Sequence, residues 1–250
     1  MDTTTLLLLA DGRFPSGSHA HSSGLEAAVA AGLVTGVPEL EAFLRGRLAT
    51  AGPVAAAFAA AARLATNPAG APLAVAPSGA PLAPAPAGAV LASPPGAILA
   101  ELDAELDART PSPTLRLASR RQGRALLRAG RATWPSPLFA DAPRHHDGCH
   151  HPIALGLTAA AAGLTAEQAA LIAAHGTVAG PASAAVRLLG LDPYQVQAVL
   201  ARLAGACDRV AAAAAADAGG PPADLPANTA PLADIYAETH ATWEVRLFAS

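Results

Sequence analysis

Alanine dominates this chain, and no other sequence feature constrains its fold as strongly. Hydrophobic residues make up 52% of the chain, but only 4% are aromatic and much of the remainder is alanine. Alanine is the best helix former and carries too little apolar area to hold a sheet together, so such a core requires closely packed helices. About eight to ten segments show helical spacing and none alternates like a strand. We therefore expect one all-α, helical-bundle-like domain spanning residues 1–250.

Charge and composition exclude several functions. The net charge of −3 gives no reason to expect nucleic acid as a partner. Every basic residue is arginine, which removes Schiff-base and P-loop lysine chemistry. The apolar run Leu6–Ala10 is too short for a signal sequence or a membrane span, and later alanine runs are interrupted by polar residues. These features predict a cytoplasmic protein without a membrane segment.

The helical pattern has clear boundaries in several places. Pro38 and Pro53 each occupy a helix-starting position, which predicts two separate helices there. Thr165 and Gln168 form a capping-box pattern. The clearest amphipathic helix is predicted over Tyr194–Ala216.

Residues 66–95 differ from the rest of the chain. This stretch holds eight prolines and three glycines, has no charged residue and shows no helical or strand period. We interpret it as a flexible, low-complexity insertion. A ligand for a proline-binding module is the alternative.

The densest run of informative residues is Phe14–Glu26. Pro15 and Gly17 favour a tight turn, and Ser18 can cap a helix running to about Ala31. That interpretation places His21 in the first helical turn. Such a segment suits contact with a partner, and it also suits an ordinary helix–loop–helix corner.

An acidic helix and an arginine-rich helix are predicted after the insertion. Glu101, Asp103, Glu105 and Asp107 fall outside an apolar stripe, which indicates a solvated surface. The next segment, Leu115–Ala132, contains six arginines. Four of them would share one helix face, either solvated or facing a partner: Arg120, Arg124, Arg128 and Arg131.

Histidines gather in a predicted loop. Imidazole and thiolate groups suit Zn²⁺, Ni²⁺ or Cu²⁺, but the paired spacing of a structural zinc site is missing. Transient metal binding and a closed structural site both stay open, so no metal ligand is firm. The candidates are His145, His146, Cys149, His150 and His151. We find no catalytic motif, so we expect no catalytic residue and no enzyme activity.

The segment 232–250 concentrates the chain's scarce aromatic residues. Tyr236, Trp243 and Phe248 all fall within these 19 residues. Exposed aromatics at that density are unfavourable, so the tail should pack either on its own domain or on a partner.

Five segments, in chain order, resemble the urease accessory protein UreF family. They comprise Leu7–Asp11 with Phe14–Ser18 and His21–Glu26, then Leu115–Arg124, His151-Pro152, Ala185–Leu188 with Gln197, and Arg246–Ser250. The second segment is similar to an Arg-x-x-Ser-x-x-Gln-Gly pattern of that family. His19, where the family commonly has an aromatic residue, and Asp192–Tyr194 depart from the pattern.

The resemblance implies a non-enzymatic, all-α accessory protein without a resident cofactor. It implies binding to UreD (also called UreH) and to the nickel-carrying GTPase UreG, delivery of Ni²⁺ to apo-urease, and a homodimer within the complex. Nickel would be present only transiently, and direct nickel binding by His145–His151 is the alternative. The partner-binding residues it indicates are Phe14, Gly17, Ser18, His21, Ser22, Gly24, Glu26, Arg116, Ser119, Gln122, Gly123, Arg124, Tyr236, Trp243, Arg246, Leu247 and Phe248.

Overall fold

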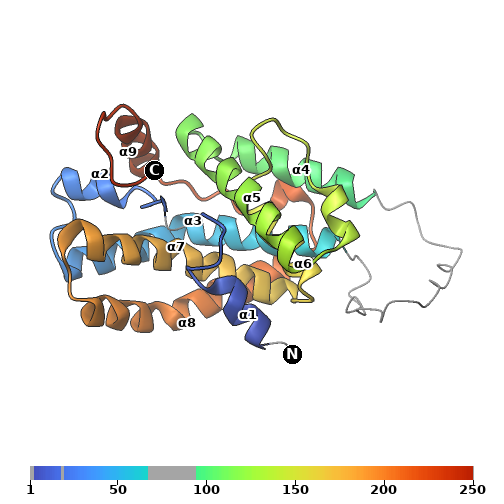
Figure 1. Ribbon diagram of the computed structural model, residues 1–250, viewed down its shortest axis with the longest axis horizontal. Coiled ribbons are helices and arrows are strands. Elements are labelled where there is room, and N and C mark those ends of the chain that lie inside the picture. The colour runs from blue at the N-terminus through green and yellow to red at the C-terminus, as the bar shows by residue number, and fades with distance from the viewer. Residues whose placement is uncertain (1–2, 18–19, 67–93, 250) are drawn as a thin grey trace, which may run out of the picture.

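The protein is all-α, as the alanine-rich composition predicts. The structure, a computed structural model, describes residues 3–17, 20–66 and 94–249, and over those ranges it contains nine α-helices and no strand (Figure 1). The helices are α1 (Thr3–Ala10), α2 (Leu25–Ala30), α3 (Val37–Ala65), α4 (Pro95–Ala108), α5 (Pro113–Thr133), α6 (His151–Ala161), α7 (Ala166–Leu189), α8 (Pro193–Asp217) and α9 (Pro231–Ala241). Two short 3₁₀ turns, η2 (Pro137–Asp141) and η3 (Pro222–Asp224), lie between them.

The core forms where α3, α6, α7 and α8 pack together (Figure 1). The run Ala56–Ala62 on α3 is buried, and small residues let the neighbouring helices come close. Gly156 on α6 shows how close: a Cβ there would lie 2.6 Å from the carbonyl oxygen of Ala59. Alanine therefore sets the helix spacing in this core.

The helix α3 is continuous, so the prediction of separate helices at Pro38 and Pro53 was wrong. A proline inside a helix leaves the carbonyl four residues earlier without its usual donor. That carbonyl belongs to Ala49, and it accepts a hydrogen bond from Nδ2 of Asn228 at 3.3 Å. A side chain from the other end of the sequence thus supplies the missing donor.

The same compensation occurs in α7, which continues through Pro181. The carbonyl freed there is that of Thr177, and Nε of Arg47 donates to it at 3.3 Å. The predicted capping box at the start of α7 is confirmed, since Thr165 and Gln168 exchange both hydrogen bonds. The predicted amphipathic helix is also confirmed as α8, which buries Val196, Val199, Leu203 and Cys207.

The helix after the N-terminal turn is shorter than predicted. It begins at Leu25 and not near residue 18, because Ser23 and Gly24 both have positive φ (56° and 87°) and interrupt a helical path. His21 therefore precedes the helix, and Ser22 Oγ accepts the hydrogen bond of Glu26 N at 3.2 Å. The proposed cap Ser18 and the insertion residues 67–93 lie outside the described residues.

Two core helices, α3 and α7, are long and apolar enough to cross a membrane by length and composition. The apolar windows of α3 and α7 are 67% and 56% buried inside the protein. Burial of this kind is expected of helices that pack on one another in a core, so it gives little support to a membrane span.

Candidate functional site

Three segments singled out in the sequence meet in space: the stretch ending in α2, the start of α5, and the C-terminal tail. Figure 1 shows α9 beside α2 and above the bundle. The Glu238 carboxylate on α9 accepts hydrogen bonds from the Ser112 hydroxyl and from Thr114 N (3.0 Å), both at the start of α5. These hydrogen bonds lower the pKa of Glu238, with the bond from Ser112 as the largest cause.

Glu26 on α2 holds the tail through a cluster of hydrogen bonds. Glu26 is only 8% exposed, and its carboxylate accepts hydrogen bonds from His240 Nε2 (2.8 Å), Leu247 N (2.8 Å) and Phe248 N (3.0 Å). We call these groups the glutamate cluster. Ala249 N adds a bond to Ala20 O at 2.7 Å, so the tail is tied to two points of the N-terminal stretch.

The tail presents one buried aromatic residue and an exposed apolar edge. Phe248 is buried, and the Arg187 guanidinium lies 4.4 Å from its ring centre, so its side chain cannot contact a partner while the tail is docked. In contrast, Val245 and Leu247 are 85% and 71% exposed. Leu232 and Ile235 on α9 are exposed as well. Of the other tail candidates, Arg246 is exposed, while Tyr236 and Trp243 are half-buried.

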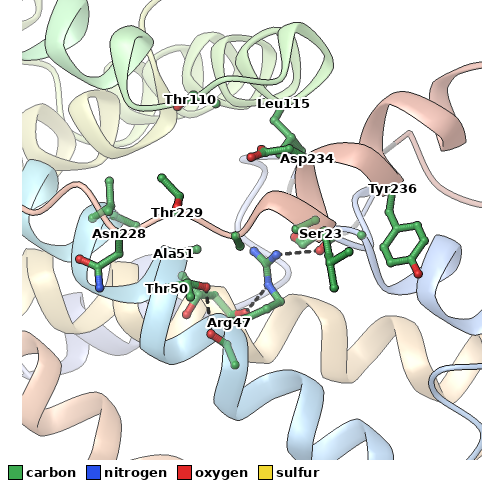
Figure 2. A pocket seen from close by; sticks show the side chains of 18 of the residues that line it. Ser23, Arg47, Thr50, Ala51, Thr110, Leu115, Asn228, Thr229, Asp234 and Tyr236 are labelled. Atoms are coloured by element: carbon green, nitrogen blue, oxygen red, sulfur yellow. Dashed lines mark hydrogen bonds between the residues drawn. The ribbon is translucent and has the colours of Figure 1, made fainter.

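A cavity of about 730 Å³ lies between α3, α5 and the segment Asn228–Tyr236 (Figure 2). Ser119 and Gln122 line it, as the sequence pattern suggested, together with Gly24 from the N-terminal stretch. Sequence reasoning missed Arg47 and Asn228. The signal that could have indicated them is the pair of internal prolines, because each leaves a carbonyl that needs a donor.

Arg47 is one of the charged residues that line this cavity (Figure 2). Its Nη1 donates to Ser23 O at 2.8 Å, while its Nε donates to Thr177 O. Burial lowers its pKa to about 10, so it stays protonated at neutral pH. Arg47 thereby connects α3, α7 and the N-terminal stretch at one point.

A second polar cluster is buried under α4, α5 and α6. Arg120, 4% exposed, donates to Asp103 (2.8 Å), to Asp107 (3.0 Å) and to Gly148 O (2.8 Å). We call Asp103, Asp107, Ser119, Arg120 and His150 the arginine cluster. The prediction that both aspartates lie on a solvated surface was wrong for Asp103, which is buried.

His150 completes the arginine cluster. Its Nδ1 lies 3.0 Å from Ser119 Oγ and its Nε2 lies 2.9 Å from Asp107 Oδ1. The Ser119 hydroxyl accepts from His151 N, so it can donate to Nδ1 while Nε2–H donates to Asp107. Burial lowers the pKa of His150, which favours this neutral form.

The expected arginine stripe is therefore not one uniform face. Arg120 points inward, Arg116 donates to Thr110 O and Pro111 O, and Arg124 donates to His146 O. Gly123 is also internal, because a Cβ there would lie 2.1 Å from Cys149 O. Arg128 and Arg131 remain exposed on α5, although Arg131 still donates to Phe139 O.

The rest of the N-terminal stretch packs largely inward. Phe14 is buried and stacks on Trp134 with ring centres 5.6 Å apart. Gly17, with φ of 78°, lies beside Ala125 of α5. Ser22 is fully buried, whereas His21 is half-buried. Most of these residues therefore support the surface by packing beneath it and are not themselves exposed to a partner.

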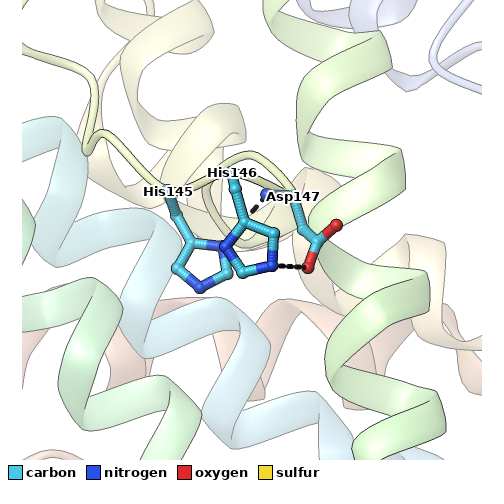
Figure 3. A group of neighbouring side chains, drawn as sticks. All are labelled: His145, His146 and Asp147. Atoms are coloured by element: carbon cyan, nitrogen blue, oxygen red, sulfur yellow. Dashed lines mark hydrogen bonds and ion pairs between the residues drawn. The ribbon is translucent and has the colours of Figure 1, made fainter.

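The histidine tract separates into an exposed part, His145 and His146, and a more enclosed part in which Cys149 and His150 are buried and His151 is half-buried. His145 and His146 are exposed and lie beside Asp147 (Figure 3). Cys149 is fully buried, and burial raises its pKa to about 12, so it cannot supply a thiolate at neutral pH. Burial, with the nearby His21, lowers the pKa of His151 to about 4. Two of the five candidates, Cys149 and His150, are thus buried away from His145 and His146, and His150 belongs to the arginine cluster.

The fold defines an all-α protein. The buried acidic and basic side chains of the arginine cluster and the glutamate cluster connect its helices to one another. Its outward features are a cavity and an apolar edge. A family model described as UreF matches residues 34–204. Proteins named urease accessory protein UreF are 43% identical in Mycobacterium sp. strain JLS, 42% in Mycobacterium marinum and 40% in Mycolicibacterium vanbaalenii. These matches cover 98–99% of this chain and 97–98% of those proteins. The chain therefore belongs to the UreF family of urease accessory proteins.

Proposed function

We propose that this protein is a non-enzymatic scaffold of urease maturation. It binds UreD/UreH and the GTPase UreG, and this assembly promotes nickel insertion into apo-urease in the cytoplasm. A homodimer within that complex is part of the proposal. Family membership supports the role in urease maturation, and the relatives' names describe accessory proteins.

The observation that carries the scaffold proposal is the exposed apolar edge of the docked tail. Val245 and Leu247 are exposed, while Glu26 accepts hydrogen bonds from the backbone amides of Leu247 and Phe248, so this edge is presented on an ordered backbone. Leu232 and Ile235 add apolar surface from α9. Exposed apolar groups on a fixed support are typical of protein-binding surfaces. We assign this edge to UreD/UreH.

The matched experiment changes the edge without touching the core. We expect the double variant V245D/L247D to weaken binding to purified UreD/UreH by more than about 100-fold, since burying each apolar side chain contributes about 1.5–3 kcal/mol. The control is Y194D, which changes an equally exposed apolar residue on α8. Titration calorimetry measures both. Unchanged affinity of V245D/L247D, with normal affinity of the control, would reject the assignment.

A further inference from the structure

The loop between η2 and α6 places three metal-binding side chains side by side (Figure 3). One ligand atom from each of His145, His146 and Asp147 lies within 4.8 Å of the other two. The sequence pattern suggested His145 and His146 among five candidates. In the structure, the third side chain beside them is Asp147 and not one of the other three candidates. The inference concerns this trio, which we call the loop triad.

Two members of the loop triad already have the separation that a metal requires. His146 Nε2 and Asp147 Oδ2 lie 2.8 Å apart. Two ligand atoms that are each about 2.1 Å from a metal and at right angles are about 3 Å apart. The ring centres of His145 and His146 are 4.2 Å apart, and both side chains are exposed. His145 Nδ1 accepts a hydrogen bond from Asp147 N at 3.1 Å, and it gives up this bond when a rotamer change brings in the third ligand.

The backbone beneath the loop triad is fixed by α5. Arg124 Nη2 donates to His146 O at 3.0 Å, and Gly148 N donates to His145 O at 2.9 Å. Gly148 has φ of 94° and lies so close to α5 that a Cβ would come within 3.0 Å of Arg120 O. Cys149, the next residue, is fully buried. Metal binding would therefore order side chains only, which keeps its entropic cost small.

We propose that the loop triad binds one late first-row divalent cation, Ni²⁺, Cu²⁺ or Zn²⁺, at an open and exchangeable surface site. Two imidazoles and one carboxylate suit these ions better than Mg²⁺ or Ca²⁺. His146 Nε2 gives up its hydrogen bond to Asp147 and presents its lone pair, with the ring proton on Nδ1. Water supplies the remaining ligands.

A neighbouring positive charge weakens the binding of a cation at this site. The Arg124 guanidinium lies 3.9 Å from Asp147, which opposes the cation and partly neutralises the carboxylate. The site should therefore load and release metal readily and not act as a closed structural centre. It does not depend on the tail or on the proposed scaffold function, so the two can fail separately.

Titration calorimetry of the tag-free full chain with NiCl₂ and, separately, ZnCl₂ tests the proposal. We expect one equivalent of metal to bind the wild type, the double variant H145A/H146A to bind none, and D147N to bind at least about tenfold more weakly. The control H175A removes an exposed histidine on α7 and should bind like the wild type.

Circular dichroism checks that the variants keep their helices, as expected for exposed side chains. Three results would overturn the proposal: no binding by the wild type, undiminished binding by H145A/H146A, or equal loss in H175A. MgCl₂ serves as the hard-cation probe and should give no heat of binding; a comparable affinity for Mg²⁺ would also overturn it.

Discussion

The arginine cluster and the glutamate cluster are both buried and built around ionised groups, yet they join very different parts of the chain. The arginine cluster connects α4, α5 and the start of α6, which follow one another in sequence and belong to the packed body. The glutamate cluster connects α2 to a tail more than 200 residues away. The first should control global stability, whereas the second should control whether the tail is docked.

The largest effect should come from removing Arg120. The variant R120M leaves the buried Asp103 without its guanidinium partner, and breaking a buried ion pair in this way costs about 3–5 kcal/mol. Urea unfolding measures the loss. R121A, which removes an exposed arginine beside it, should change stability by no more than about 0.5 kcal/mol. If R120M lost as little as R121A, the arginine cluster would not stabilise the body.

The next effect should come from Glu26 and should be local. E26Q removes the charge that accepts three hydrogen bonds, which should cost the docked tail about 1–3 kcal/mol. Hydrogen exchange should accelerate at the amides of Leu247 and Phe248 while the core helices keep their protection. E244Q, an exposed change in the same tail, is the control. Uniformly faster hydrogen exchange across α3 and α7 would contradict the claim that the glutamate cluster acts only on the tail.

Acid should act on the body through the start of α6. Burial lowers the pKa of His150, and it lowers the pKa of His151 to about 4. Between pH about 6.5 and 4, these histidines therefore bind protons in the unfolded chain more readily than in the folded chain. Stability should therefore fall by about 1–2 kcal/mol between pH 7 and 5. Urea unfolding at both pH values measures this. H151Q should flatten the dependence; an unchanged slope in H151Q would show that other groups cause it.

The smallest effect concerns the segment that leads into α9. N228A removes the donor to the carbonyl freed by Pro53 and should cost about 0.5–1.5 kcal/mol. In the background of P53A, which restores a helical N–H to that carbonyl, the same change should cost less. A double-mutant cycle by urea unfolding gives the coupling. A coupling of zero would mean that Asn228 does not compensate for the proline.

Much of the fold follows from local chemistry, which is why the sequence predicts it. Alanine and leucine spacing indicates an all-α core, and the capping box at Thr165 needs only its own four residues. The continuity of α3 through Pro53 is different. It depends on a donor 179 residues away, which no local pattern contains.

The site was only partly predictable for the same reason. The family-like pattern identified Ser119 and Gln122, which line the cavity. Asp103 was missed although it follows Leu99 by four residues and so shares the buried face of α4. Glu26 was singled out, but two of its three tail partners are backbone amides, and backbone groups carry no sequence signal.

Hydrogen exchange of the full chain with and without purified UreD/UreH tests the central claim most directly. The account predicts added protection in the docked tail, in α9 and in residues 20–26, because these segments form one surface. Protection confined to other helices, or none in the tail, would contradict it.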